Sequence, residues 1–300
     1  MYLIMIAPGI INGMSGLFIL RVIAINILTE SLFLYRSKGD IVLLNSRGEI
    51  GVVTFATFGK TNRHRDYSTQ VSRLESECKK IGLELSTFSF SNGSGNANYE
   101  VVQRKLPMRK GAGYWSWKAQ VIKLAVNYIS TRYILYVDCD LKLRGLPDVS
   151  SIPGFMDTGV AVFKTNERLK AWTSTKCLKN FALIDNDELP VIAANVVLID
   201  RLNANSEEFL NRWDKALSDY GNLLDPFWSF RQNHRHDQSI LSCLIATAQV
   251  QVSFFSPGYF GTGIDNGFLK PGDAWIIHGD LETQSMAKIR SIPSQLKTYI

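Results

Sequence analysis

Tyr133-Ile134-Leu135-Tyr136-Val137-Asp138-Cys139-Asp140 is the stretch of this 300-residue chain that decides its fold. The first five residues are apolar on both faces, which is typical of a central strand that is buried on both sides of a sheet. The strand ends abruptly in two aspartates. Because open α/β sheets bind ligands at the carboxyl ends of their strands, this segment predicts both the fold class and the place of a site.

Short apolar runs around this strand, separated by amphipathic or turn-rich segments, predict an α/β domain. The expected strands are Gly51–Phe58, Leu85–Phe90, Tyr133–Val137, Gly159–Phe163, Val191–Ile199, Val250–Phe255 and Ala274–His278. Between the first two, Tyr67–Ile81 carries Val71, Leu74 and Cys78 at helical spacing. A strand, a helix and a strand at this spacing favour a right-handed crossover and a Rossmann-like, mainly parallel sheet flanked by helices.

The two aspartates after the central strand are candidate metal ligands. Residues two apart in an extended segment point the same way, so Asp138 and Asp140 could converge on one hard divalent cation while Cys139 faces the opposite side. Two like charges at the end of an apolar strand repel each other unless a metal or a basic group compensates them. The competing interpretation is a pair of solvated turn residues.

A second segment offers the groups that a diphosphate requires. The run Arg109-Lys110-Gly111-Ala112-Gly113 leads into Tyr114-Trp115-Ser116-Trp117-Lys118 and then into a helix that extends to about Tyr128. Glycines before a helix start, with Arg109 and Lys118 on either side, predict an anion site built on free N–H groups and the helix dipole. The expected buried stripe of the helix consists of Trp117, Val121, Leu124 and Tyr128.

The composition narrows the class of ligand. A formal charge of +6 and 46% hydrophobic residues describe a globular chain that favours anionic ligands. The basic residues are scattered, so we expect no extended nucleic-acid surface. Four separated cysteines, without CxxC pairs, indicate free thiols in a reducing compartment.

The N-terminal segment 1–40 is apolar and is expected to lie outside the folded domain, which we place at residues 46–290. Residues 1–20 carry no charged side chain, as in a membrane span, but Pro8 and several glycines weaken them as a helix. If the segment inserts, the basic residues that follow, beginning with Arg21, keep the catalytic part on the cytoplasmic face. The alternative is an extension that precedes the folded protein.

With these segments identified, the chain resembles the GT-A class of glycosyltransferases, in which a DxD motif follows an apolar strand. The stretch Lys105–Leu143 is similar to a group of bacterial glycosyltransferases, many tied to cell-surface polysaccharides. That group has a basic-Gly-x-Gly-Tyr-Trp-x-Trp-Lys-Pro segment, and here Ala119 replaces the proline. The resemblance implies a GT-A fold and a hexosyltransferase that uses a nucleotide-sugar donor, with a UDP-sugar as the expected donor.

The resemblance also assigns roles to individual residues. The first strand of the GT-A fold cradles the nucleoside base, so Thr54, Ala56 and Thr57 are candidate uridine contacts. Two later segments are similar to family 8, the glycogenin-like retaining enzymes: His236-Asp237-Gln238 and Trp275-Ile276-Ile277-His278. They imply Asp237 and Gln238 near the reacting sugar, and Asp138, Asp140 and His278 as ligands of Mn²⁺ or Mg²⁺. The Lys-Pro-Trp that follows in family 8 is absent.

The expected function is metal-dependent transfer of a sugar to a saccharide or lipid-linked acceptor. Retention is implied by the family 8 features, whereas inversion would require Asp237 as a base. Two other classes stay open: a metal-dependent nucleotidyltransferase or phosphohydrolase, and a noncatalytic carbohydrate-binding protein. Asp237 also has a simpler interpretation as the cap of the helix Gln238–Ala246.

Overall fold

The computed structural model describes residues 49–59, 66–90, 97–101, 111–223 and 234–255, together with the backbone of strands at 32–37, 40–45, 260–261 and 276–278. Seven strands form the central sheet: β3 (Ile50–Phe55), β4 (Leu85–Phe90), β5 (Tyr99–Val101), β6 (Tyr133–Val137), β8 (Val160–Arg168), β9 (Pro190–Asp200) and β10 (Ser253–Phe254). Their spatial order is β10-β8-β9-β6-β3-β4-β5.

The sheet is mainly parallel, as the sequence predicts. Only β9 runs against its neighbours, β6 and β8, while the other four neighbouring pairs of this sheet are parallel. The chain passes from β3 to β4 and β5 toward one edge, and then returns to place β6 on the other side of β3. This reversal makes the boundary between β3 and β6 a topological switch point, where α/β sheets open a crevice at their carboxyl edge.

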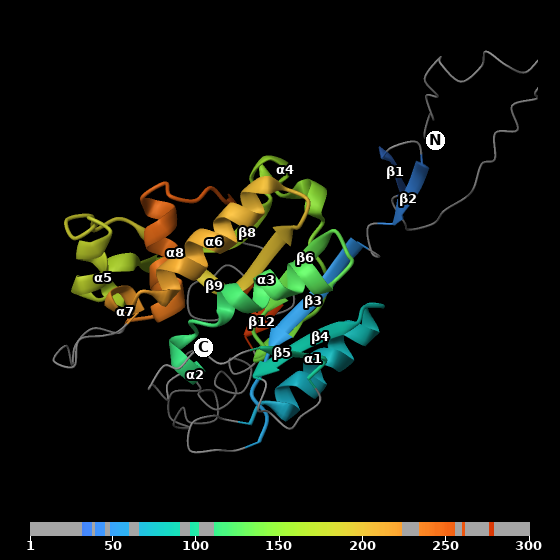
Figure 1. Cartoon of the computed structure of the whole chain (residues 1–300), viewed down its shortest axis with the longest axis horizontal. Coiled ribbons are helices and arrows are strands. Elements are labelled where there is room, and N and C mark those ends of the chain that lie inside the picture. The colour runs from blue at the N-terminus through green and yellow to red at the C-terminus, as the bar shows by residue number, and fades with distance from the viewer. Residues whose placement is uncertain are drawn as a thin grey trace, which may run out of the picture.

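Helices cover both faces of the sheet (Figure 1). One face carries α1 (Ser68–Lys80), and the other carries α3 (Lys118–Tyr128), α6 (Ala204–Ser218) and α8 (His236–Ala246). The shorter helices and turns are α2 (Gly111–Tyr114), α4 (Phe155–Thr158), α5 (Thr175–Asn180), α7 (Tyr220–Leu223), η2 (Val149–Ser151) and η3 (Leu169–Trp172). The architecture is therefore a three-layer α/β/α arrangement.

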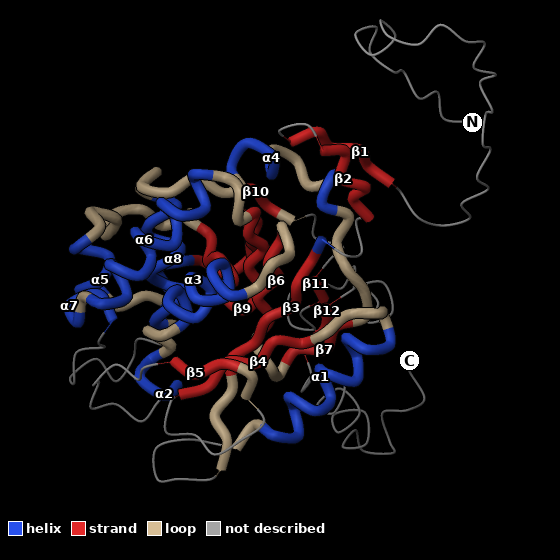
Figure 2. Tube along the Cα trace, turned by 45° about the vertical axis from the view of Figure 1, so that its right-hand side comes forward, coloured by secondary structure: helices blue, strands red, loops and turns tan. Residues whose placement is uncertain are grey.

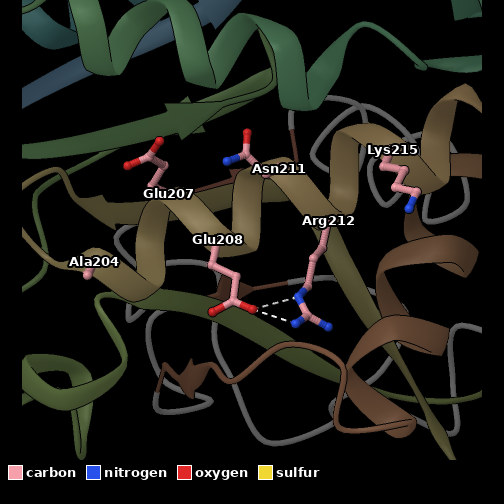
Figure 3. Close-up of a pocket in the computed structure, with 6 residues that line it drawn as sticks. All are labelled: Ala204, Glu207, Glu208, Asn211, Arg212 and Lys215. Atoms are coloured by element: carbon pink, nitrogen blue, oxygen red, sulfur yellow. Dashed lines mark hydrogen bonds and ion pairs between the residues drawn. The ribbon is translucent and has the colours of Figure 1, made fainter.

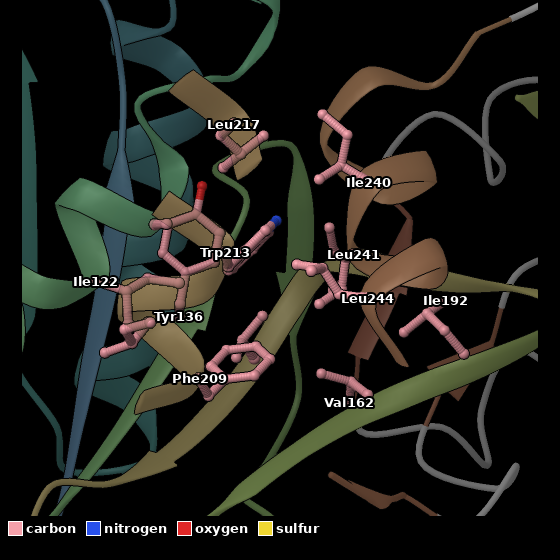
Figure 4. Close-up of a cluster of buried hydrophobic side chains, with 14 of the residues drawn as sticks. Ile122, Tyr136, Val162, Ile192, Phe209, Trp213, Leu217, Ile240, Leu241 and Leu244 are labelled. Atoms are coloured by element: carbon pink, nitrogen blue, oxygen red, sulfur yellow. The ribbon is translucent and has the colours of Figure 1, made fainter. Parts of the chain in front are cut away.

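The two hydrophobic cores follow from the alternation of side chains along the buried strands. All five residues of β6 are buried: Ile134 and Tyr136 belong to the core under α3, α6 and α8, whereas Leu135 and Val137 belong to the core under α1. Figure 4 shows the first core, in which Trp213 of α6 lies between β6 and α8. A strand with two buried faces explains the uninterrupted apolar run.

The predicted helix Tyr67–Ile81 is confirmed as α1, and Val71, Leu74 and Cys78 are its buried residues. The stripe predicted for α3 is partly wrong. Val121 is buried and Trp117, just before the helix, packs in the core, but Tyr128 is 63% exposed and Leu124 is only half-buried. Ala119, Ile122 and Ala125 are buried instead, because α3 packs against α6 as well as against the sheet, and Tyr128 is the last residue of the helix.

Two small sheets complete the described backbone. One is the hairpin of β1 (Leu32–Ser37) and β2 (Asp40–Asn45), and the other joins β7 (Leu141–Leu143), β12 (Ile276–His278) and β11 (Phe260–Gly261). Among the residues that the structure describes, none forms a helix long and apolar enough for a bilayer. The expected domain limits, 46 and 290, and the apolar residues 1–31 lie outside the described residues.

Candidate active site

Three side chains from separate parts of the chain meet at the switch point. Lys118 is the first residue of α3, Asp138 directly follows β6, and Asp237 lies in the first turn of α8. The Lys118 ammonium lies 3.1 Å from Asp138 Oδ1 and 2.7 Å from Asp237 Oδ2. The sequence predicted each of these residues for the site, but it did not predict that Lys118 bridges the two carboxylates.

Two of the three side chains in this ion-pair network are almost fully buried. Lys118 is 1% exposed and Asp237 is 5% exposed. Burial alone would lower the pKa of Lys118, but the two carboxylates outweigh it and the net shift is upward. Burial raises the pKa of Asp237, and the charge of Lys118 offsets only part of that rise. Asp237 is therefore an ion-paired side chain inside the first helical turn, and α8 begins one residue before it, at His236.

Tyr136 connects the hydrophobic core to the site. Its hydroxyl donates to Asp138 Oδ1 at 2.6 Å, and its ring lies 5.5 Å from the Lys118 ammonium. Burial raises the pKa of the Tyr136 phenol well above its ordinary value, so the hydroxyl stays protonated and remains a donor. Sequence reasoning missed this role, although its spacing of two residues before Asp138 on one strand placed both side chains on the same face.

The segment after β6 is a turn rather than a continued strand. Leu141 N–H donates to the Asp138 carbonyl at 3.0 Å, and Asp138 N–H donates to the Asn195 carbonyl of β9 at 2.9 Å. Cys139 points into the core under α1, as predicted. Asp140 does not continue the side-chain alternation of β6, because the chain turns here toward β7. The half-buried Asp140 takes its position from this turn.

Two amide groups beside the carboxylates hold buried oxygens that lack hydrogen bonds. Asn195 Oδ1 and Gln238 Oε1 have no hydrogen-bond partner among the described residues. Asn195 is adjacent to Asp138 through the backbone hydrogen bond just described, and Gln238 follows Asp237 in α8. A buried polar atom without a partner costs about 1–3 kcal/mol, so such atoms indicate a place where a ligand supplies the missing donor.

The short helix α2 and the residue after it, Trp115, form a strained turn next to the site. Ala112, Tyr114 and Trp115 have φ values of 53°, 55° and 56°, a left-handed region that costs non-glycine residues about 1–2 kcal/mol each. The Tyr114 ring lies 4.0 Å from the ring of His236, which directly precedes Asp237 and also has a positive φ. Strain of this kind persists where packing enforces it, and it concentrates at functional sites.

The three predicted base contacts lie at the end of β3, beside the site. Thr54 is fully buried, and its hydroxyl donates to the Val137 carbonyl at 2.7 Å, which joins the ends of β3 and β6. Ala56 and Thr57 follow the strand and are also buried, and Ala56 N–H donates to the Phe88 carbonyl. The hydroxyl of Thr54 thus has a structural partner. Contact of these residues with a nucleoside base stays a prediction, and Arg109 lies outside the described residues.

The donor chemistry of the Asp138 turn fits a hard divalent cation. Two carboxylates lie within one turn, and the Asp138 side chain keeps 22% of its surface exposed. Backbone pairing of β12 with β7 sets His278 opposite Leu141, the residue after Asp140. Within the described part of the chain, no set of three His, Cys, Asp or Glu side chains is arranged to hold a metal. The three-ligand set Asp138, Asp140 and His278 therefore remains a prediction.

A separate surface hollow lies on the solvent side of α6 (Figure 3). Its lining residues are Ala204, Glu207, Glu208, Asn211, Arg212 and Lys215. All six belong to one helix, and Arg212 pairs with Glu208 there. This hollow is a feature of an exposed helix face and is separate from the carboxylate site.

No family model matches the chain, and no curated protein sequence matches it. Similar solved structures include the apo form of the bifunctional glycosyltransferase WbbM, with TM-score 0.48 and 11% identity over 77% of this chain and 45% of that one. A second is the apo form of mouse xyloside xylosyltransferase 1, with TM-score 0.45 and 12% identity over 78% of this chain and 98% of that one. A third is a glycosyltransferase involved in glycosylation of the major capsid of PBCV-1, with TM-score 0.40 and 13% identity over 76% of this chain and 93% of that one. This chain spans less than half of WbbM.

Proposed function

We propose that this chain is a metal-dependent glycosyltransferase of the GT-A type, which moves a sugar from a nucleotide-sugar donor to a saccharide or lipid-linked acceptor. The observation that carries the proposal is the buried bridge from Asp138 through Lys118 to Asp237 at the switch point between β3 and β6. A nucleotide-binding crevice is expected at this place in an α/β sheet.

The positive groups at this edge suit a diphosphate. The Lys118 ammonium offsets part of the negative charge of Asp138 and Asp237, and α3 and α8 both begin here, so the positive ends of two helix dipoles adjoin the site. Asp138, Asp140 and His278 would hold a divalent cation, which supplies a Lewis acid for the leaving diphosphate. Together, these groups stabilise the negative charge that develops as the nucleotide departs.

The neutral polar groups suit a sugar. Asn195 Oδ1 and Gln238 Oε1 are buried acceptors without partners among the described residues, and sugar hydroxyls are the donors that they lack. The Asp237 carboxylate lies next to Gln238 and can stabilise the positive charge that builds on the sugar ring in the transition state. We propose a UDP-sugar as the donor because of the likeness of the β3 end to a uridine cradle.

The proposed transfer breaks the bond between the anomeric carbon and the diphosphate oxygen, and forms a bond from that carbon to an acceptor hydroxyl oxygen. The acceptor proton passes to the leaving phosphate in a retaining reaction, or to Asp237 in an inverting one. The anomeric configuration of the product, read by proton NMR, distinguishes the two routes. The family 8 likeness favours retention.

The test is ligand-dependent stabilisation of the full chain by UDP-, GDP- and CMP-sugars, with and without Mn²⁺. At a ligand concentration of 100 times Kd, binding adds about 2.7 kcal/mol of stability, which raises Tm by about 5–11 °C for a domain of this size. We expect a shift with one nucleotide class, dependent on Mn²⁺ and lost in Asp140→Asn. The matched control is Asp185→Asn, which removes an exposed carboxylate.

Product identification then separates the classes of enzyme. A glycosyltransferase releases a nucleoside diphosphate, whereas a phosphohydrolase that attacks the diphosphate releases a nucleoside monophosphate and a sugar phosphate. Mass spectrometry of the reaction distinguishes these sets. A folded protein that no donor stabilises, or a product set of the second kind, would overturn the proposal.

A further inference from the structure

Two residues of α1 contact the turn that carries the aspartates. Arg73 Nη2 donates to the Cys139 carbonyl at 3.0 Å and to the Leu141 carbonyl at 2.8 Å. Glu77, one helical turn later, accepts the Leu143 N–H at 2.8 Å through Oε2. Figure 2 shows α1 beside β7, the strand that begins at Leu141. Both side chains lie next to the buried stripe of α1, so the packing of the helix fixes where they reach.

The two carbonyls that Arg73 binds belong to the residues on either side of Asp140. The Cys139 carbonyl lies in the peptide plane before Asp140, and the Leu141 N–H, which donates to the Asp138 carbonyl, lies in the plane after it. These two contacts together restrict φ and ψ of Asp140, and the Leu141 carbonyl fixes the next plane of the turn. The backbone of Asp138 is held separately, through its N–H to Asn195 and its carbonyl to Leu141. The turn from Asp138 to Leu141 is thus held from β9 through Asn195 and from α1 through Arg73.

The charge of Arg73 is balanced within the same contact. Glu77 Oε1 lies 3.7 Å from Arg73 Nε, and the two side chains are 17% and 30% exposed, respectively. An unpaired cation bound to this turn would oppose a divalent cation at Asp138 and Asp140. The negative charge of Glu77 offsets that repulsion, and the same carboxylate accepts a hydrogen bond from the backbone of β7. An ordinary helix-surface pair at i and i+4 would stabilise α1 by only about 0.2–0.5 kcal/mol and would not need contacts to another element.

We propose that Arg73 and Glu77 are positioning residues that hold Asp140 in the geometry required for a divalent cation. This inference rests on the proposed function, because it assumes that Asp140 binds the metal. Partners that orient a metal ligand typically change metal affinity by about 10- to 100-fold when they are removed. Arg73 fixes the turn through its hydrogen bonds to two carbonyls, and Glu77 supplies the compensating negative charge.

Direct binding of Mn²⁺ to the full chain, measured by calorimetry and by electron paramagnetic resonance, tests the proposal without an activity assay. We expect Arg73→Gln to weaken Mn²⁺ binding by about 10- to 100-fold, while kcat recovers at saturating metal. Arg73→Lys should restore only part of the affinity, because an ammonium lacks the planar fork of the guanidinium. Glu77→Gln keeps an acceptor for Leu143 and removes only the charge, so it should weaken binding less.

Matched controls lie on the exposed face of the same helix: Lys80→Gln removes a positive charge and Glu75→Gln removes a negative one. A second readout is alkylation of Cys139, which is 7% exposed and whose carbonyl Arg73 binds. It should become faster in metal-free Arg73→Gln than in the unmodified chain and the Lys80→Gln control.

The outcomes separate the inference from the proposed function. If the unmodified chain does not bind Mn²⁺, the proposed metal site fails, and this inference fails with it. If the unmodified chain binds Mn²⁺ and Arg73→Gln binds it equally well, or if Lys80→Gln loses as much affinity as Arg73→Gln, only the inference is overturned.

Discussion

Replacing Lys118 by methionine should destabilise the protein more than any other single change at the site. Methionine fills a similar volume but removes the only side-chain cation that the described residues place between Asp138 and Asp237. Both carboxylates would then face each other near the ends of two helices, without the ammonium that now lies about 3 Å from each. A buried charge that loses its partner is far more costly than a buried pair that is replaced as a whole.

The magnitude follows from the burial of the network. Removing one partner of a buried ion pair costs about 3–5 kcal/mol, and Lys118 is 1% exposed. For a domain of about 250 residues, each kcal/mol lowers Tm by about 2–4 °C, so we expect a decrease of about 6–20 °C. Asp237→Asn should cost less, because Lys118 keeps Asp138 as a partner.

Thermal unfolding followed by circular dichroism measures these changes, and a double-mutant cycle isolates the pair. Lys118→Met combined with Asp237→Asn should be less destabilised than the sum of the single changes, because one uncompensated carboxylate is gone. The matched control is Lys123→Met on the same helix, where the ion pair with Asp214 spans 3.7 Å at 37% and 23% exposure and should contribute below about 1 kcal/mol. Strict additivity, or equal effects at Lys118 and Lys123, would refute the reasoning.

Three further outcomes are expected. Because the folded pKa of Lys118 is raised above its unfolded value of about 10.4, its stabilising contribution is complete below that pH and is lost as pH rises beyond it. The Tm difference between the unmodified chain and Lys118→Met should therefore stay constant from pH 7 to about 10 and become smaller above it. A Tm difference that stays constant above pH 10 would contradict the raised pKa of Lys118. Burial raises the pKa of Cys78 to about 12, so an aromatic disulfide reagent at pH 8 should modify Cys78 only after denaturation, as located by mass spectrometry. Trp213 is fully buried, and its indole Nε1 has no hydrogen-bond partner among the described residues. Trp213→Ala should lower the free energy of unfolding in urea by about 3–5 kcal/mol, and Trp213→Phe should lower it much less. Equal losses of stability in the two variants would show that the indole nitrogen has a partner.

The elements that the sequence predicts best are those whose pattern reflects one local environment. The strands at residues 85–90 and 133–137 have the bounds expected from the sequence, and a polar residue precedes and follows each of them. Val250–Phe255 has four apolar residues among six and is expected as one strand, but only Ser253–Phe254 pairs with β8. Hydrophobicity reports burial, whereas a strand also needs a neighbour with free hydrogen-bonding groups, and only the assembled sheet supplies that information.

The residues of the site could be predicted, but their connections could not. Asp138 and Lys118 stood out because of their neighbours in the sequence, and Asp237 stood out because of a family likeness. The bridge between them depends on how α3 and α8 pack on the same face of the sheet, which no local pattern specifies. The same holds for Arg73, which reads in the sequence as a solvated residue beside the buried stripe of α1 and proves to contact a turn 66 residues away.

The position of the site follows from the same alternation that builds the core. Ile134 and Tyr136 point into the core under α3, α6 and α8, and the next residue on that face of the chain is Asp138. At that depth α3 and α8 present their first turns, so Asp138 contacts Lys118, which also contacts Asp237, whereas Ile134 and Tyr136 belong to the same core as Trp213. The charged network therefore continues the hydrophobic core beyond the end of β6. A change that shifts α3 or α8 against the sheet must also displace the ammonium or a carboxylate, and this couples the packing of the core to the geometry of the site.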